Sequence, residues 1–154
     1  MSVFTPAHLG KWEALYKRLL EGESLPLTED GVWMLGRKTG IIAVTHDGEP
    51  IYIEATRDIG KTVGEYINGG ANCDFRTKVA TVEFGASPRN ANERSRKGPL
   101  ADRINRMLPQ YRFTAVPATD ALAERLAGAF TIVADPRLNG PTAHANAVID
   151  ALPR

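Results

Sequence analysis

The stretch GIIAVTHDGEPIYIEA, residues 40–55, constrains the fold of this chain more than any other. Two apolar runs, residues 40–45 and 50–55, are separated by a polar tetrapeptide that contains Asp47-Gly48. Asp-Gly is a strong turn signal between such runs, because glycine accepts the positive φ that tight hairpin turns require. The stretch therefore predicts an antiparallel β-hairpin.

Helical spacing of apolar residues is found along most of the chain outside the hairpin. Helix-start signals, such as a capping Thr or Asp or a first-turn proline, precede several of these runs. We therefore expect helices over residues 6–21 and 57–67, from Pro99, from Thr119-Asp120 to the residue before Asp135, and, as a short one, within residues 141–154.

The segment between these helices is harder to interpret. A helix capped by Asp74 would carry Phe75, Val79 and Val82 on one face, while its β-branched residues leave a strand as the alternative. Residues 85–98 have no apolar anchor, and we expect them to form a loop.

Two further strands are expected, over residues 31–35 and 112–118. A hairpin near the start, followed by helices, a strand and a helix, favours an antiparallel sheet flanked by helices, which is an α+β fold. A length of 154 residues fits one domain with a sizeable core. We divide it into an N-terminal helix and loop (1–30), a core (31–140) and a C-terminal tail (141–154).

Composition excludes several classes of protein. No apolar run approaches the length of a membrane span, and the N-terminus lacks the basic and apolar regions of a secretory signal. The single cysteine, Cys73, cannot form an internal disulfide, which fits a reducing cytoplasm. The histidines show no spacing typical of a zinc site, so we expect neither a metal nor a cofactor.

The hairpin, the helix after it and a late helix that ends in Pro-x-x-Asn at residues 136–139 together resemble the GIY-YIG nuclease domain over residues 31–140. In that family one strand carries Gly-Ile-Tyr and the next carries Tyr-Ile-Gly. Here Gly40-Ile41-Ile42 stands at the first motif, and YIEATRDI, from Tyr52, echoes the family's Tyr-Ile-Gly-x-Thr-x-Asp-Leu. The resemblance implies a small antiparallel three-stranded sheet flanked by helices, to which this chain adds its N-terminal helix.

Several positions that carry the family's catalytic groups hold other residues here. Ile42 stands in place of a tyrosine, Thr62 in place of an arginine, and Ala127 in place of the metal-binding glutamate. The family uses these groups to activate water, to stabilise charge on the phosphate and to hold one divalent ion, and losing such groups costs orders of magnitude in rate. We interpret the matching residues as vestiges of an active site. They are Tyr52, Tyr66 and Asn139.

The favoured hypothesis is a catalytically inactive protein that binds DNA or RNA. Residues 76–112 hold nine Lys and Arg against three acids, so this segment carries +6 while the whole chain carries +1. Clusters of flexible cations of this kind bind phosphate backbones. The candidate contact residues are Arg76, Lys78, Arg89, Arg94, Arg96, Lys97, Arg103 and Arg106.

Two alternatives stay open. The chain could be a protein-interaction inhibitor or adaptor, for instance a phage or mobile-element counter-defence protein, whose acidic remainder faces a basic partner and whose Trp12 or Trp33 anchors it. It could also be a weak Mg²⁺- or Mn²⁺-dependent endonuclease, with Glu124 as metal ligand and Arg57 or Lys61 replacing the missing arginine. Arg57 precedes Thr62 by about one and a half helical turns, a spacing at which the two side chains point in different directions.

Overall fold

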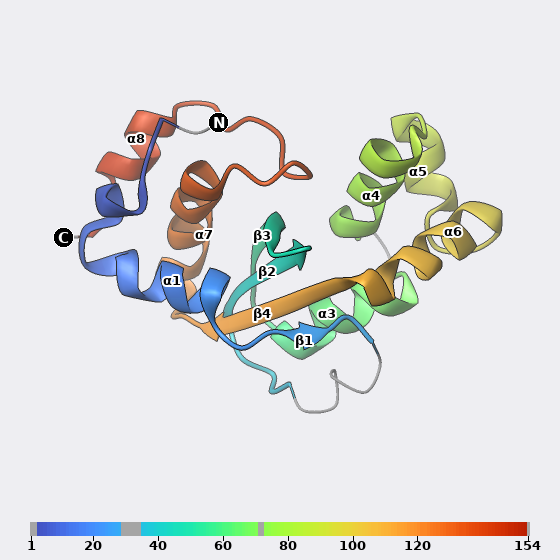
Figure 1. Cartoon of the computed structure of the whole chain (residues 1–154), viewed down its shortest axis with the longest axis horizontal. Helices are drawn as coiled ribbons and strands as arrows, with labels where there is room; N and C mark the ends of the chain where they lie inside the picture. Colours follow the sequence, from blue (N-terminus) through green and yellow to red (C-terminus); the bar gives the residue numbers. More distant parts are fainter. Residues whose placement is uncertain (1–2, 29–34, 71–72, 154) are drawn as a thin grey trace.

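A computed structural model describes residues 3–28, 35–70 and 73–153 of the chain. A central sheet carries helices on both of its faces (Figure 1). The strand expected over residues 31–35 lies outside the described residues except for Leu35, and Trp33 lies outside them as well. None of the described helices is long and apolar enough to cross a membrane.

The sheet has four antiparallel strands in the order β1-β4-β2-β3. The expected hairpin is confirmed: β2 (Gly40–His46) pairs with β3 (Glu49–Thr56), and both turn residues, Asp47 and Gly48, have positive φ. Strand β4 (Tyr111–Pro117) pairs with the other side of β2. The α+β class is therefore confirmed.

The expected number of three strands is wrong by one. Strand β1 (Leu25–Pro26) has only two residues and pairs with the free side of β4. A two-residue strand has no periodicity that a sequence pattern can reveal, and a proline is tolerated there because β1 lies at the edge of the sheet.

Two clusters of buried side chains occupy the two faces of the sheet. Successive residues of a strand point to opposite faces, so Ile41 and Ala43 of β2 join one cluster while Ile42 and Val44 join the other. The first face is covered by η1 (Pro6–Trp12), α1 (Glu13–Glu21), α7 (Asp120–Ala134) and α8 (Ala145–Asp150). The second is covered by α3 (Ile59–Asn68), α4 (Asp74–Phe84), α5 (Pro88–Arg94), α6 (Pro99–Met107) and η2 (Leu108–Gln110). Figure 1 shows α1, α7 and α8 to the left of the sheet and α4 to α6 to its right.

The N-terminal helix is present but interrupted. Gly10 adopts φ 57° and ψ −127°, which is not helical, so a 3-10 segment precedes α1. Trp12 is half-buried, and its indole Nε1 donates a hydrogen bond to the Pro153 carbonyl at 2.8 Å. Trp12, a candidate exposed anchor for a partner, is therefore partly buried and connects the N-terminal helix to the C-terminal segment.

The C-terminal segment contributes to the fold rather than trailing from it. Helix α8 contacts α7, and Ile149 and Leu152 are buried in the cluster that also contains Phe130. The short helix expected within residues 141–154 is therefore confirmed.

The loop expected over residues 85–98 is wrong, because α5 occupies its centre. The Ser87 side chain accepts a hydrogen bond from the Asn90 amide at 3.2 Å, and Pro88 holds the first helical position. Both are standard helix-start features. Ala91 is fully buried, so one small side chain supplies the core contact that the sequence did not reveal.

The ambiguous segment from Asp74 is a helix, α4. Phe75 and Val79 are buried as expected, but Val82 is 48% exposed. The expectation that Val82 faces the core is therefore wrong. Helix α4 buries a face that runs from Phe75 through Arg76 to Ala80 instead.

Candidate functional site

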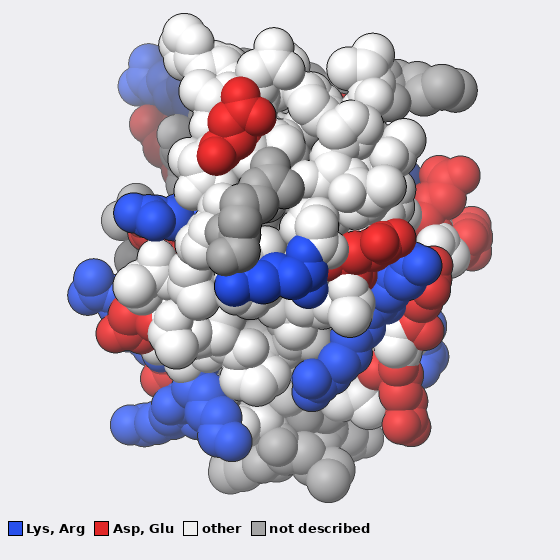
Figure 2. Space-filling model, turned by 90° about the vertical axis from the view of Figure 1, so that its left-hand side faces the viewer, with Lys and Arg blue, Asp and Glu red and all other residues white. Residues whose placement is uncertain are grey.

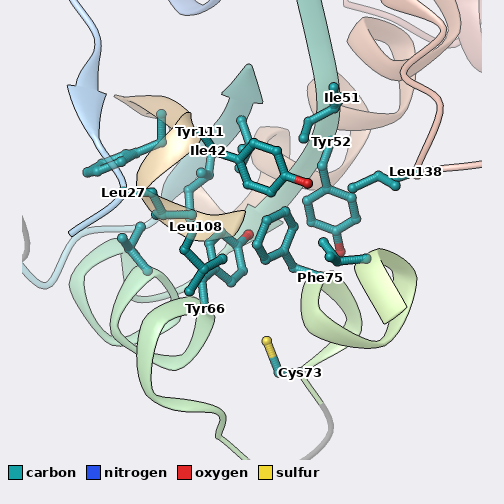
Figure 3. Close-up of a cluster of buried hydrophobic side chains, with 14 of the residues drawn as sticks. Leu27, Ile42, Ile51, Tyr52, Tyr66, Cys73, Phe75, Leu108, Tyr111 and Leu138 are labelled. Atoms are coloured by element: carbon teal, nitrogen blue, oxygen red, sulfur yellow. The ribbon is translucent and has the colours of Figure 1, made fainter. Parts of the chain in front are cut away.

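The two tyrosines that match the family motifs lie in the core, on the face of the sheet that α3 to α6 cover. Tyr52 of β3 and Tyr66 of α3 are only 3% and 1% exposed. Their ring centroids are 6.2 Å apart in an edge-to-face arrangement, and Phe75 of α4 lies 4.5 Å from the Tyr66 ring (Figure 3). Such ring pairs stabilise a core beyond simple burial. Both tyrosines are therefore packing residues rather than the lining of an open surface.

Both tyrosine hydroxyls are hydrogen-bonded to carboxylates. Tyr52 donates to Asp74 Oδ2 at 2.7 Å, and Tyr66 donates to Glu54 Oε2. Burial, reinforced by the Glu54 charge, raises the pKa of both tyrosines, which keeps the hydroxyls protonated. Burial also raises the pKa of Glu54, against the opposite effect of the Tyr66 hydrogen bond. Protonated, buried phenols cannot take a proton from an attacking water.

The replaced catalytic positions also serve packing. Ile42 is fully buried in the same cluster as Tyr52. The Thr62 hydroxyl lies 2.6 Å from the Thr56 hydroxyl, which ties α3 to the end of β3. Ala127 is buried on α7, on the opposite face of the sheet. Each side chain has a structural contact where the family would have a charged or proton-transferring group.

Asn139 holds the segment after α7 to the edge strand β3. Its Oδ1 accepts from the Ile53 amide at 2.9 Å, and its Nδ2 donates to the Ile53 carbonyl at 2.8 Å. The Leu138 amide adds a bond of 3.0 Å to the Ile51 carbonyl. Asn139 thus satisfies backbone groups that an edge strand otherwise leaves unpaired.

Glu124 lies in a cleft of about 200 Å³ on the α7 side of the sheet. Arg57, expected to point away from the position of Thr62, contributes to the same cleft. The Thr39 hydroxyl donates to Asp120 Oδ1 at 2.5 Å within it. The described residues that line the cleft are Thr39, Ala55, Thr56, Arg57, Asp120, Ala123 and Glu124.

Glu124 and the two tyrosines are not brought together, because they belong to opposite sides of the sheet. Within the part of the chain that the structure describes, no three His, Cys, Asp or Glu side chains converge as a metal-binding group. Cys73 is buried beside the tyrosines, and burial raises the pKa of its thiol to about 11. A thiol of this kind is a poor nucleophile near neutral pH.

Arg76, the first of the candidate phosphate contacts, is inside the protein. Its side chain is 1% exposed, its Nε donates to the Ser95 carbonyl at 2.9 Å, and its Nη1 donates to the Tyr66 carbonyl at 2.9 Å. The guanidinium joins α3, α4 and the segment after α5, so it is not accessible to a phosphate. Val79 and Ala80, three and four residues further on, are buried, and this helical spacing is the sequence signal that was missed.

The remaining cations of the basic segment are at the surface to different degrees. Lys78 is half-buried on α4. Arg89 pairs with Glu93 at 3.2 Å, and the Arg103 guanidinium lies 4.5 Å from the centre of the Phe84 ring. These interactions occupy the cations but leave Arg89 and Arg103 exposed.

Four exposed cations are free to meet an anion. Arg96 uses only Nε, which donates to the Gly69 carbonyl at 3.2 Å. Arg94, Lys97 and Arg106 make no hydrogen bond or ion pair with another described residue. They lie at the end of α5, in the turn after it and on α6. We refer to Arg94, Arg96, Lys97 and Arg106 as the basic surface.

On the face that carries α1 and α8, uncharged side chains cover much of the surface, and basic and acidic side chains both occur among them (Figure 2). Lys17 of α1, for example, pairs with Glu13 at 3.4 Å.

Comparison with models of protein families finds no match for this chain, and comparisons with curated proteins and with solved structures find none either. The function of this chain is therefore inferred from its residues and their geometry.

Proposed function

We propose that this protein binds DNA or RNA through the phosphate backbone and does not cleave it. The observation that carries the proposal is the basic surface: four exposed cations over α5, α6 and the turn between them, three of which have no partner among the described residues. Cations without internal partners are the groups that neutralise phosphates and release counterions.

The core supports the second half of the proposal. Tyr52 and Tyr66 are buried and bonded to carboxylates, and Ile42 and Ala127 fill positions where the resembling family has reactive groups. We take the core over residues 31–140 to be a GIY-YIG-like scaffold in which packing residues stand at the catalytic positions. The single cysteine favours a cytoplasmic location.

Fluorescence anisotropy of labelled single-stranded and duplex DNA and RNA, at several salt concentrations with Mg²⁺ present, tests this proposal. We expect binding that weakens steeply with salt and a probe that stays intact on a denaturing gel. The Arg94→Ala/Arg96→Ala/Lys97→Ala variant should bind more weakly, and its log-log salt slope should be shallower by roughly one for each phosphate that it no longer neutralises.

A triple variant with the same reduction in charge, Lys17→Ala/Arg18→Ala/Arg125→Ala, is the matched control because its residues are exposed on α1 and α7. It should bind as the wild type does. Equal reductions of affinity in both variants would mean that net charge alone drives binding, and absence of binding even at low salt would contradict the proposal and favour a protein partner.

A weak metal-dependent endonuclease is the second candidate, favoured by one observation: Arg57 and Glu124 line the same cleft. Glu124 would hold a divalent ion and Arg57 would face the phosphate. Cleavage of the probe in Mg²⁺ or Mn²⁺ that disappears in the Glu124→Ala variant would establish this activity, while an intact probe under all conditions would exclude it.

A further inference from the structure

A second concave feature lies between the end of α3, the end of α6 and the two residues that follow strand β1. It is a groove of about 360 Å³, within the range of small-molecule sites. Two asparagines, Asn68 of α3 and Asn105 of α6, contribute to its walls. We call it the asparagine groove, and the described residues that line it are Leu27, Thr28, Ile67, Asn68, Asn105, Leu108 and Pro109.

The walls of the asparagine groove combine apolar and amide groups. Leu27 and Leu108 are buried core residues, so they form an apolar base. The carboxamides of Asn68 and Asn105 are exposed and make no hydrogen bond with another described residue. Each carboxamide offers both donors and an acceptor without carrying a charge.

This combination matches the chemistry of a nucleobase. A base has two apolar faces and an edge of alternating donors and acceptors, and asparagine is a common partner for such edges. In a single strand these edges are free to be read, whereas in a duplex the Watson–Crick edges are already paired.

The basic surface adjoins the groove at Arg96. Asn68 is followed by Gly69, whose carbonyl accepts the Nε–H of Arg96 at 3.2 Å. The Arg96 guanidinium is therefore held next to the residue that follows Asn68. Its two terminal nitrogens make no hydrogen bond with a described residue. A phosphate next to a nucleotide bound in the groove would meet the positive charge of Arg96.

We propose that the asparagine groove binds an unpaired base of a single-stranded nucleic acid, while Arg96 holds a neighbouring phosphate. The proposal rests on the proposed function and adds to it a preference for single strands. Because the groove binds the base and the basic surface binds the phosphates, the two can be separated experimentally.

The test compares the full-length protein and its Asn68→Ala/Asn105→Ala variant in binding to labelled single strands and to a duplex of the same length and composition. We expect the wild type to prefer the single strand. The variant should bind the single strand about tenfold or more weakly, the range for removing hydrogen bonds to a base, with an unchanged salt slope and unchanged duplex binding. Strands of DNA and RNA are both included, and a difference in affinity shows which of the two the groove prefers.

The Asn146→Ala variant, which removes an exposed carboxamide from α8, is the matched control and should bind as the wild type does. Circular dichroism confirms that each variant is folded, and single substitutions replace the double one if it is not. Equal affinity for single strand and duplex, or full affinity of the double variant, would contradict the proposal that the groove binds a base. The proposed function would still hold in that case if the Arg94/Arg96/Lys97 variant binds more weakly than the wild type. If the protein binds none of the probes, both the base-binding groove and the proposed function are wrong.

Discussion

The tyrosine cluster behind the sheet and the basic surface over α5 and α6 use polar residues in opposite ways. In the cluster, the Tyr52 and Tyr66 rings are buried (Figure 3), and their hydroxyls donate hydrogen bonds to the Asp74 and Glu54 carboxylates. On the basic surface, Arg94 and Lys97 are exposed and have no partner among the described residues. A polar group that is already satisfied inside contributes to the fold, whereas one without an internal partner is available to a ligand.

The same contrast divides the basic segment itself. Arg76 and Arg94 were expected to have the same role, since both are arginines in one positively charged stretch. Arg76 is buried with three carbonyl acceptors within reach, and Arg94 is at the surface with none. If the comparison is correct, the two arginines should affect different properties of the protein.

The largest expected effect is therefore the loss of stability in Arg76→Ala. This change leaves the Tyr66 and Ser95 carbonyls without their donor, and unsatisfied buried groups cost about 1–3 kcal/mol each. We expect the free energy of unfolding, measured in urea, to fall by about 3 kcal/mol. Arg94→Ala should change it by less than about 0.5 kcal/mol. Similar values for the two variants would remove the distinction between the regions.

An intermediate effect is expected for Tyr66→Phe, which sharpens the comparison inside the core. Loss of the hydroxyl leaves the half-buried Glu54 carboxyl without its donor, so we expect the free energy of unfolding to fall by about 1–3 kcal/mol.

Tyr111→Phe provides the matched control for this prediction. The Tyr111 hydroxyl is buried and has no hydrogen-bond partner among the described residues, so its removal should be neutral or stabilising. If Tyr111→Phe loses as much stability as Tyr66→Phe, the hydrogen bond to the Glu54 carboxyl is not the cause of the loss in Tyr66→Phe.

The smallest expected effect is a pH dependence from Glu54. Burial raises the pKa of Glu54 above its usual value of 4.5, so in the folded protein the carboxyl keeps its proton at pH values where the unfolded chain has lost it. Its contribution to stability is complete below pH 4.5 and is lost as pH rises through the folded pKa.

Urea unfolding from below pH 4.5 to neutral pH measures this contribution. The stability of the wild type should fall with rising pH relative to that of Glu54→Gln, which cannot ionise. Glu93→Gln, which removes an exposed carboxylate on α5, should follow the wild type. A wild type whose stability runs parallel to that of Glu54→Gln would contradict the prediction.

Local signals in the sequence were sufficient for the elements that the chain specifies within a few residues. Asp47-Gly48 placed the hairpin, and Thr119-Asp120 and Pro99 placed the starts of α7 and α6, because turns and helix starts depend on the φ preferences and hydrogen bonds of adjacent residues. Helix α5 was not predicted because its one buried residue is the small Ala91. Strand β1 was not predicted because two residues have no periodicity.

The candidate site was predicted less completely than the fold. The sequence identified the basic segment and the residues missing from the nuclease motifs, since both can be read directly from residue types. It did not reveal that Arg76 is inside, that Arg57 and Glu124 share a cleft, or that Asn68 and Asn105 face one groove.

For this protein, the sequence alone determined the α+β class, the hairpin, most of the helices and the concentration of positive charge. The tertiary structure decided which polar residues are satisfied inside and which are exposed. The physical reason is that burial and hydrogen bonding depend on residues far apart in the chain: the partners of Arg76 lie on either side of it, near the ends of α3 and α5, and only folding brings them to one guanidinium.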